Sequence, residues 1–469
     1  MGRGVTLWRN PMNINDSFRY LNMGLPEDIL RRKIFGDFEG AVRLIDRRLA
    51  MENTPDGLRA CLAAQREMIL RTPADYPYTR EMALARLRSH IPDFSEDEFD
   101  ERVETGKIGW IYINGEMHFF ARFFETMCKV EPAFALRAGI QTAGVEASGA
   151  KENRLDRVMR VMKERGGMAC RIRIRATMRL KDEHFTPGMF IRAHLPIPAA
   201  CPQQSDIVIE KVEPPGGVIA PEDALQRTVC WEMNMEENHE FAVEYSYIHR
   251  AVYHDVDAIV ADLVQPDFDT GEEAPHIVFT PYIRELVDSL SAGTDDPLEK
   301  ARRFYDFITL NMKYNFMPAY FGLENIAETC ARNFSGDCGV FALLYLTMCR
   351  CAGIPARWQS GFTAEPDFCG GHDWVRFYIA PYGWLYADCS YGTGAVRVGN
   401  EERRRFYFGN LDPYRMVAND AFQAPFTTDK AHWRADPYDN QVGEMETADR
   451  GLRYDEFDRW KGILSHEEV

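Results

Sequence analysis

The sequence lacks the signals that direct a chain into or across a membrane. No stretch approaches eighteen consecutive apolar residues, so no membrane-spanning helix is predicted. The start, Met1-Gly2-Arg3-Gly4-Val5-Thr6, has no apolar stretch of the kind found in signal peptides. It fits the short pattern for N-myristoylation, but that pattern is permissive and no polybasic segment follows it. We therefore expect a cytoplasmic protein with no membrane partner.

The eleven cysteines lack the spacings that mark a metal or redox motif. The absence of any C-x-x-C pair excludes a zinc ribbon and a thioredoxin-type site. Without a secretion signal, the cysteines are expected to be reduced thiols and not a disulfide framework. A looser metal site is the alternative, built from the four residues Cys338, Cys369, His372 and Cys389. We expect no metal and no cofactor.

Positively charged residues are also fewer than negatively charged residues. The chain has 55 Lys and Arg against 72 Asp and Glu, a formal net charge of −17, which argues against nucleic acid as the main partner. Apolar and aromatic residues, by contrast, make up 45% and 12% of the chain, which is enough for sizeable cores. A length of 469 residues predicts two to four domains.

Residues 1–148 are predicted to form a mainly helical domain with one β-hairpin. Apolar residues recur at helical spacing over 34–69, and a capping box at 95–98 opens a further helix. The hairpin is predicted at 110–119, where Asn114-Gly115 is a specific turn signal. Helices followed by a hairpin could form a winged helix that binds nucleic acid. A basic recognition stripe is missing, so a structural or partner-docking role is favoured.

Residues 168–252 are predicted to form a β domain of short antiparallel strands. In the first strand, apolar residues alternate with a row of arginines, which could bind an acidic partner or form a solvated face. Regular short strands separated by Pro- and Gly-rich turns favour an immunoglobulin-like β-sandwich. The row consists of Arg171, Arg173, Arg175 and Arg179, and the later strands are expected at 189–195, 206–212, 227–233 and 240–248.

One cysteine, Cys338, lies where the sequence predicts the start of a buried helix. The residues around it read SGDCG, an apolar run follows at 340–346, and a Gly-Ile-Pro at 353–355 closes the helix. Ser335 or Asp337 is available as the N-cap. Because free N–H groups and the positive end of the helix dipole favour an anion, we expect a lowered thiol pKa and hence a thiolate nucleophile.

Two strand-like runs downstream carry a histidine and an aspartate. The first begins at His372, the second ends at Asp388, and a turn centred on Pro381-Tyr382 joins them into a predicted hairpin. In acyl-transfer chemistry a histidine takes the proton of the thiol, and a carboxylate orients the histidine. A two-residue turn would place Asp388 opposite Val375 instead of His372. The contact is therefore expected to need a bulge or bend, which Gly370-Gly371 could provide, although these glycines could equally be loop.

This pattern resembles the transglutaminase-like core of the papain-like cysteine enzymes. The likeness covers about 276–400 and follows the family's order of motifs. The motifs are Gly336-Asp337-Cys338, the helix that ends before Gly353-Ile354-Pro355-Ala356-Arg357, His372-x-Trp374, and Trp384 followed by Asp388. The resemblance implies a catalytic core at 276–469, in which Cys338, His372 and Asp388 form the catalytic triad. The residues after 391 are expected to finish this core as strands and loops.

The expected fold is therefore α+β and multidomain: a helical N-terminal domain, an immunoglobulin-like β-sandwich and a papain-like transglutaminase core. The backbone N–H of Cys338 would be one oxyanion donor by its position at the helix start. The resemblance implies a second donor from a side chain upstream, for which Tyr314 and Asn315 are candidates. Every residue assigned to the chemistry follows Lys313, so residues 1–250 are expected to serve recognition or assembly and to contribute nothing to the chemistry.

The same three residues support an amide hydrolase, a peptidase or a transamidase that passes the acyl group to an amine. The resemblance favours a bacterial-type cysteine hydrolase that acts through a thioester on a peptide or protein. No EF-hand loop is present, and little room remains after residue 420 for the trailing β domains of calcium-dependent transglutaminases. A protein transglutaminase is one alternative, and a non-catalytic binding or scaffold protein on the same fold is the other. The sequence does not define the oligomeric state.

Overall fold

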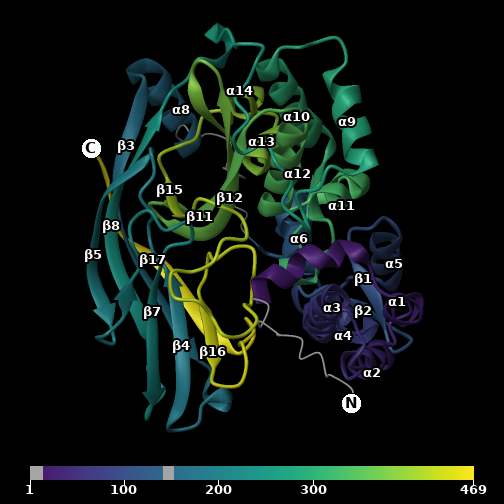
Figure 1. The fold of residues 1–469 in the computed structure, drawn as a ribbon. Helices are drawn as coiled ribbons and strands as arrows, with labels where there is room; N and C mark the ends of the chain where they lie inside the picture. The colour runs from purple at the N-terminus through teal and green to yellow at the C-terminus, as the bar shows by residue number, and fades with distance from the viewer. Residues whose placement is uncertain (1–13, 141–152) are drawn as a thin grey trace, which may run out of the picture.

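A computed structural model describes residues 14–140 and 153–469, and the amino-terminal pattern of residues 1–6 lies outside these ranges. The structure is a mixed α+β fold with helices and several antiparallel sheets. In Figure 1 the N-terminal helices lie at the lower right, two long-stranded sheets lie at the left, and a central sheet with its helices lies between and above them. In the described ranges no helix is long and apolar enough to cross a membrane.

The N-terminal part consists of short helices and one hairpin. Ser95 forms both hydrogen bonds of a capping box with Glu98, so the helix begins where the sequence predicts it. Asn114 and Gly115 both have positive φ, which matches the twist of a tight hairpin. The elements are η1 (Ile14–Met23), α1 (Glu27–Ile34), α2 (Phe38–Leu49), α3 (Asp56–Asp75), α4 (Arg80–His90), α5 (Glu96–Glu104), β1 (Trp110–Ile113), β2 (Glu116–Phe119), α6 (Phe123–Val130) and α7 (Pro132–Arg137).

Two four-stranded antiparallel sheets follow helix α8 (Arg154–Arg165), in the orders β16-β4-β7-β6 and β17-β3-β8-β5. They pack on each other through contacts such as that between Trp231 and Phe241, whose ring centroids are 5.3 Å apart. The strands from this part of the chain are β3 (Gly167–Leu180), β4 (Met189–Pro196), β5 (Gln204–Glu213), β6 (Val218–Ile219), β7 (Thr228–Met235) and β8 (Phe241–Val252).

The arginine row lies on β3, an interior strand of its sheet, and three of its four members form ion pairs within the protein. Arg173 contacts Glu244 at 2.9 Å, and Arg175 contacts the same carboxylate at 2.9 Å. Arg179 contacts Asp182 at 2.6 Å. Arg173, Arg175 and Arg179 thus neutralise carboxylates of the protein itself, and binding of an acidic partner by the row stays a prediction.

The carboxyl-terminal part departs from the expectation of strands and loops that finish the core. Residues after Asp388 first form two helices, α13 (Cys389–Arg397) and α14 (Glu401–Phe406). The expected strands follow as β14 (Phe408–Gly409) and β15 (Arg415–Asn419), which both join the core sheet. The last strands, β16 (Glu444–Thr447) and β17 (Phe457–Glu468), instead pair with β4 and β3 of the two four-stranded sheets. Such pairings join segments far apart in the chain, which local sequence patterns do not encode.

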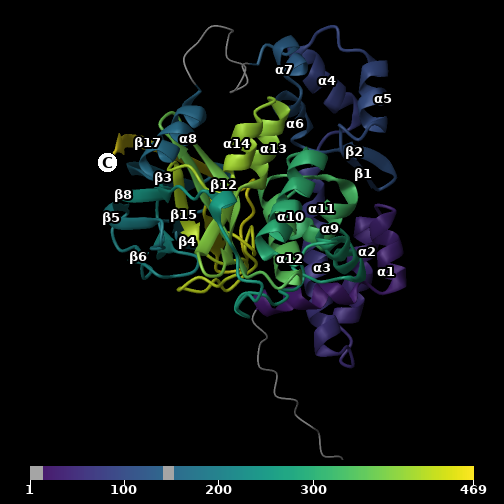
Figure 2. The same cartoon turned by 90° about the horizontal axis from the view of Figure 1, so that it is seen from above.

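The core sheet is antiparallel, with the strand order β14-β13-β12-β11-β15. Helix α12 (Cys338–Cys351) packs on one face of it, and the rings of Tyr345 and Phe377 have centroids 5.8 Å apart. Residues 339–349 of α12 are all buried, as expected for a helix that is apolar all round. The two views show this sheet between the long-stranded sheets and the helices α10–α12 (Figures 1 and 2).

The remaining elements complete the core around α12 and the sheet. They are α9 (Pro281–Ser291), α10 (Pro297–Asn311), β9 (Lys313–Tyr314), η4 (Tyr320–Gly322), α11 (Ile326–Asn333), β10 (Ser335–Gly336), β11 (Ala356–Glu365), β12 (Phe368–Ile379), β13 (Gly383–Ala387) and β14 (Phe408–Gly409), with η2 (Asp182–His184) and η3 (Val256–Ala258) elsewhere in the chain.

Candidate active site

Cys338 is the first residue of α12, and its side chain is half-buried. Asp337 is the N-cap: its Oδ1 accepts a hydrogen bond from the backbone N–H of Val340 at 3.3 Å. Gly339 allows the neighbouring groups to approach, because a Cβ there would overlap the Tyr320 hydroxyl and would lie 2.8 Å from Asp373 Oδ2. The SGDCG sequence thus supplies both the helix cap and the space around the thiol.

His372 and Asp388 are brought together at the open end of the hairpin. His372 Nε2 and Asp388 Oδ2 are 2.7 Å apart, and both side chains are buried. Ala387 pairs with Val375, one residue away from the expected register, because residues 380–382 form the turn. Asp388 follows the strand end and lies diagonally across from His372 on the same face of the sheet.

The structure has no bulge at Gly370-Gly371, so the prediction of a bulge is wrong. Both glycines pair with β11 in unbroken register, with Gly370 opposite Thr363 and Gly371 opposite Phe362. A diagonal neighbour on the same face is within reach of a histidine side chain without a bulge. The apparent need for a bend came from the assumed two-residue turn.

Arg415, which the sequence did not single out, completes the buried histidine–aspartate pair. Its Nη1 donates to Asp388 Oδ2 at 2.8 Å, and its Nε donates to Asp412 Oδ2 at 3.1 Å. Against the effect of burial, the charges of His372 and Arg415 lower the pKa of Asp388 below its ordinary value. An ionised Asp388 accepts hydrogen bonds only, so the proton of the neutral imidazole is on Nε2 and the lone pair is on Nδ1.

The hydrogen-bond partner of the Cys338 thiol is Asp373, the residue after His372. Cys338 Sγ lies 3.2 Å from Asp373 Oδ2, and no hydrogen bond joins Cys338 to His372 in this structure, which describes both residues. Burial, with the carboxyl groups of Asp373 and Asp337, raises the pKa of the thiol well above its ordinary value. The expected lowering of this pKa is therefore wrong for the structure as it stands, because burial and two carboxyls outweigh the helix dipole.

Asp373 belongs to a carboxyl pair that the sequence analysis missed. The side-chain amide of Gln441 donates to Asp373 Oδ1 and, at 2.8 Å, to Asp439 Oδ2. Burial and the proximity of Asp439 raise the pKa of Asp373 well above its usual range. Asp439 is held by further donors, Ser360 and the amide of Asn419. Two buried carboxyls this close together favour a shared proton over two charges.

The N-terminal part of the chain contacts residues next to the candidate site, and the expectation that residues 1–250 contribute nothing to the bond-breaking chemistry stays a prediction. Lys129 of α6 is the positive charge that lowers the pKa of the Cys338 thiol, against the stronger opposing effects of burial and carboxyls. Its Nζ lies 3.8 Å from the centroid of the Tyr314 ring. Nearby, Thr126 Oγ1 accepts from the backbone N–H of Phe316 at 3.3 Å, which fixes α6 against the core.

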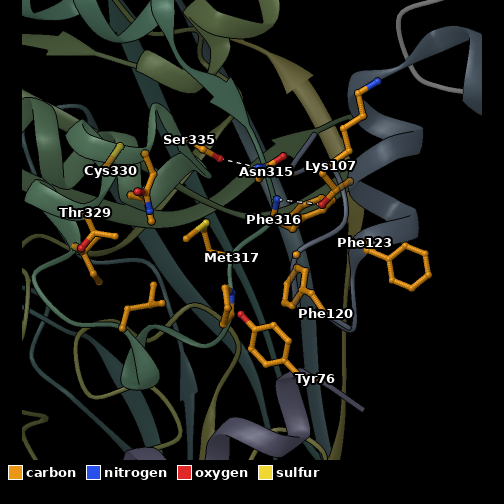
Figure 3. Close-up of a pocket in the computed structure, with 18 of the residues that line it drawn as sticks. Tyr76, Lys107, Phe120, Phe123, Asn315, Phe316, Met317, Thr329, Cys330 and Ser335 are labelled. Carbon is orange, nitrogen blue, oxygen red and sulfur yellow. Dashed lines mark hydrogen bonds between the residues drawn. The ribbon is translucent and has the colours of Figure 1, made fainter. Parts of the chain in front are cut away.

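The two candidate oxyanion donors, Tyr314 and Asn315, occupy different surroundings. The Cys338 thiol is one of the groups that raise the pKa of Tyr314, so the phenol lies within electrostatic reach of the sulfur. Asn315 Nδ2 donates to Ser335 Oγ at 2.6 Å, and both side chains line a cavity of about 330 Å³ between the core and the N-terminal helices (Figure 3). Tyr314 is the last residue of β9 and Asn315 follows the strand.

No group of three or more His, Cys, Asp or Glu side chains able to hold a metal ion occurs in the described ranges, 14–140 and 153–469. Cys338, Cys369, His372 and Cys389, the alternative metal set, do not form such a group. Cys389 is buried and Cys369 is half-buried.

Cys338 at the start of the buried helix and the buried His372–Asp388 pair on the adjoining antiparallel sheet lie within one continuous segment of the chain. Residues 284–389 match the model of the transglutaminase-like superfamily, and the chain contains a domain of this superfamily. No curated protein gives a significant match to the chain.

Several solved structures are similar to parts of the chain. A proposed cysteine protease from Cytophaga hutchinsonii shares 15% identity and a TM-score of 0.37, covering 64% of this chain and 91% of that one. The periplasmic domain of TgpA from Pseudomonas aeruginosa shares 15% identity and a TM-score of 0.27, covering 56% of this chain and 100% of that one. Red sea bream transglutaminase shares 10% identity and a TM-score of 0.20, covering 46% and 45% of the two chains.

Proposed function

We propose that this protein is a cysteine hydrolase that cleaves an amide or peptide bond through a thioester intermediate. The observation that carries the proposal is the position of the ordered pair His372–Asp388 directly beside the residue that contacts the Cys338 thiol. The pair lies in the transglutaminase-like domain, and Cys338 is the first residue of the buried helix of that domain. A nucleophile, a base and a carboxylate that orients the base are the parts that acyl transfer requires.

The chemistry follows from the protonation states. Asp373 contacts the Cys338 thiol and strand alternation turns His372 to the opposite face of β12, so the proposed reaction requires the thiol to leave Asp373 and meet the imidazole. His372 Nδ1 then accepts the thiol proton as Cys338 Sγ attacks the carbonyl carbon, and Asp388 stabilises the imidazolium through Nε2. The tetrahedral intermediate then expels the amine, which takes the proton from Nδ1, and leaves an acyl–sulfur bond. Water, deprotonated by the neutral imidazole, attacks this thioester and releases the acid and the free thiol. The backbone N–H of Cys338 and the phenol of Tyr314 are the proposed oxyanion donors.

Transamidation is the second outcome that the same residues support, with an amine in place of water. We keep hydrolysis as the main proposal because the sequence has no EF-hand loop for a calcium ion. The expected substrate is a peptide or protein. No nucleic-acid partner is proposed, since the net charge is −17.

The test is acylation of the full chain by an activated ester, followed by intact-mass analysis and peptide mapping. Acyl adduct at Cys338, lost in Cys338→Ala and reduced in His372→Ala, is the expected result. Cys351→Ala is the matched control, because it removes a half-buried thiol from the other end of the same helix. Adduct at another cysteine, or none in a folded protein, would overturn the proposal. A dansylated amine added after acylation separates the outcomes: its incorporation indicates transamidation, and release of acid indicates hydrolysis.

A further inference from the structure

A second cavity, of about 250 Å³, lies between the core sheet and strand β17, and it shares no lining residue with the cavity of about 330 Å³. Its lining includes Phe362 of β11, Gln441, and the consecutive residues Arg459, Trp460 and Lys461 of β17. Lys461 Nζ lies 4.3 Å from the centroid of the Phe362 ring, so the ammonium rests on an apolar surface. The cavity therefore combines aromatic walls with two positive charges.

The two cations are free of counter-ions. In the part of the chain that the structure describes, no carboxylate lies within ion-pair distance of Lys461 or Arg459. Arg459 is exposed and lies over the rings of Tyr454 and Phe457. Burial lowers the pKa of Lys461 to about 8. An unpaired cation in an apolar setting, in a chain with a net charge of −17, is the counterpart of an anionic ligand.

The cavity adjoins the Cys338 site through one side chain. Gln441 lines the cavity and also donates to Asp373, whose other oxygen lies 3.2 Å from Cys338 Sγ. Gln441 can occupy this place because residue 371 is glycine: a Cβ there would overlap its amide oxygen. Phe362, under Lys461, pairs with Gly371. Gly371 and Asp373 are on the same face of β12, about 7 Å apart along the strand.

From this placement we infer that the cavity is a substrate subsite for a carboxylate, held by Lys461 next to the bond that Cys338 attacks. The ligand class is an acidic acyl group or peptide whose carboxylate lies roughly 7–10 Å from the scissile carbonyl. Phe362 and Trp460 would contact the apolar spacer between the two groups. The inference rests on the proposed function, because it assumes that Cys338 is the reacting atom.

The test uses a series of bromoacetylated amino acids, from glycine through γ-aminobutyrate to ε-aminocaproate, each compared with its uncharged methylamide. The rate of alkylation at Cys338 is followed by peptide mapping. We expect the carboxylate to react faster than the amide at one spacer length, by about tenfold, the effect of one charge-assisted hydrogen bond. Lys461→Met should abolish this preference, and Lys461→Arg should keep most of it.

The controls distinguish failure of the subsite inference from failure of the proposed function. Iodoacetamide, which has no carboxylate, should alkylate Cys338 equally in the wild type and in Lys461→Met, and equal melting temperatures show that the variant is folded. If iodoacetamide modifies Cys338 but no spacer length prefers the carboxylate, the subsite inference fails and the proposed function stands. If Cys338 is inert to every reagent in the folded protein, the proposed function fails. If the Lys461→Met variant still reacts faster with the carboxylate than with the methylamide, a group other than Lys461 binds the carboxylate and the inference is wrong.

Discussion

Asp373→Asn is expected to lower the pKa of the Cys338 thiol. The substitution keeps the shape of the side chain and removes a carboxyl oxygen that lies 3.2 Å from the sulfur. A full charge at that distance disfavours the thiolate by about 1.3 kcal/mol at a dielectric constant of 80 and by about 5 kcal/mol at 20. These energies correspond to roughly one to four pKa units. Because Asp373 shares a proton with Asp439, it carries only part of this charge, and we expect a decrease of about one unit, at the lower end of the range.

The assay is the pH dependence of the iodoacetamide alkylation rate at Cys338, measured by peptide mapping of the full chain. The thiolate is the reacting form, so the midpoint of the rate profile reports the thiol pKa. In Asp373→Asn the midpoint should move to lower pH, and the rate at neutral pH should rise. Asp367→Asn is the control, because Asp367 is an exposed carboxylate paired with Arg154.

A second variant, Asp439→Asn, is expected to shift the pKa of the Cys338 thiol in the opposite direction. Asp439 raises the pKa of Asp373, so its removal lets Asp373 ionise at lower pH. An ionised Asp373 disfavours the thiolate more strongly, and the midpoint for Cys338 should move to higher pH. If the two variants shift the midpoint in the same direction, or if Asp373→Asn leaves it unchanged, Asp373 does not control the thiol and this account is wrong.

Three further predictions concern the groups around His372. Arg415→Met removes one member of a buried ion-pair network and should cost about 3–5 kcal/mol of stability, measured by denaturant unfolding; an unchanged midpoint would refute its buried pairing. Asp388→Asn should lower kcat on the order of 10³-fold without unfolding the chain, and near-normal turnover would remove Asp388 from the site. Burial lowers the pKa of His372, so the neutral base persists to lower pH than for an ordinary histidine. The acidic limb of the kcat/KM profile should therefore lie below about pH 6.5, and Lys129→Met, which removes a nearby positive charge, should move it to higher pH.

The parts of the site that the sequence could predict are those set by local rules. Asp337 caps the helix at Cys338 because a side-chain acceptor one residue before a helix satisfies its free N–H groups. The hairpin of β12 and β13 follows from two β-forming runs around a Pro- and Gly-containing turn. Its register was off by one residue, since the turn length is the least constrained part of such a pattern.

The parts that the sequence could not predict depend on distant segments of the chain. Arg415 and Asp439 reach the site from beyond the matched family region, and no local pattern marks them. Asp373 was visible beside His372, but alternation along a strand places it on the opposite face. Only the packing of α12 shows that this other face meets the Cys338 thiol. The thiol pKa was misjudged for the same reason, because burial and carboxyl neighbours are tertiary effects.

The pairing of β17 with β3 has a consequence for the order of events during biosynthesis. Gln441 and Lys461 emerge from the ribosome about 100 and 120 residues after Cys338. At about 5–20 residues per second, the thiol precedes Lys461 by roughly 6–25 seconds. During that interval β3 is not paired with β17, and Asp373 has no hydrogen bond from the Gln441 amide. A nascent chain in this state carries the Cys338 thiol without the contacts that surround it in the folded protein, so the time at which the thiol acquires its final pKa is set by translation.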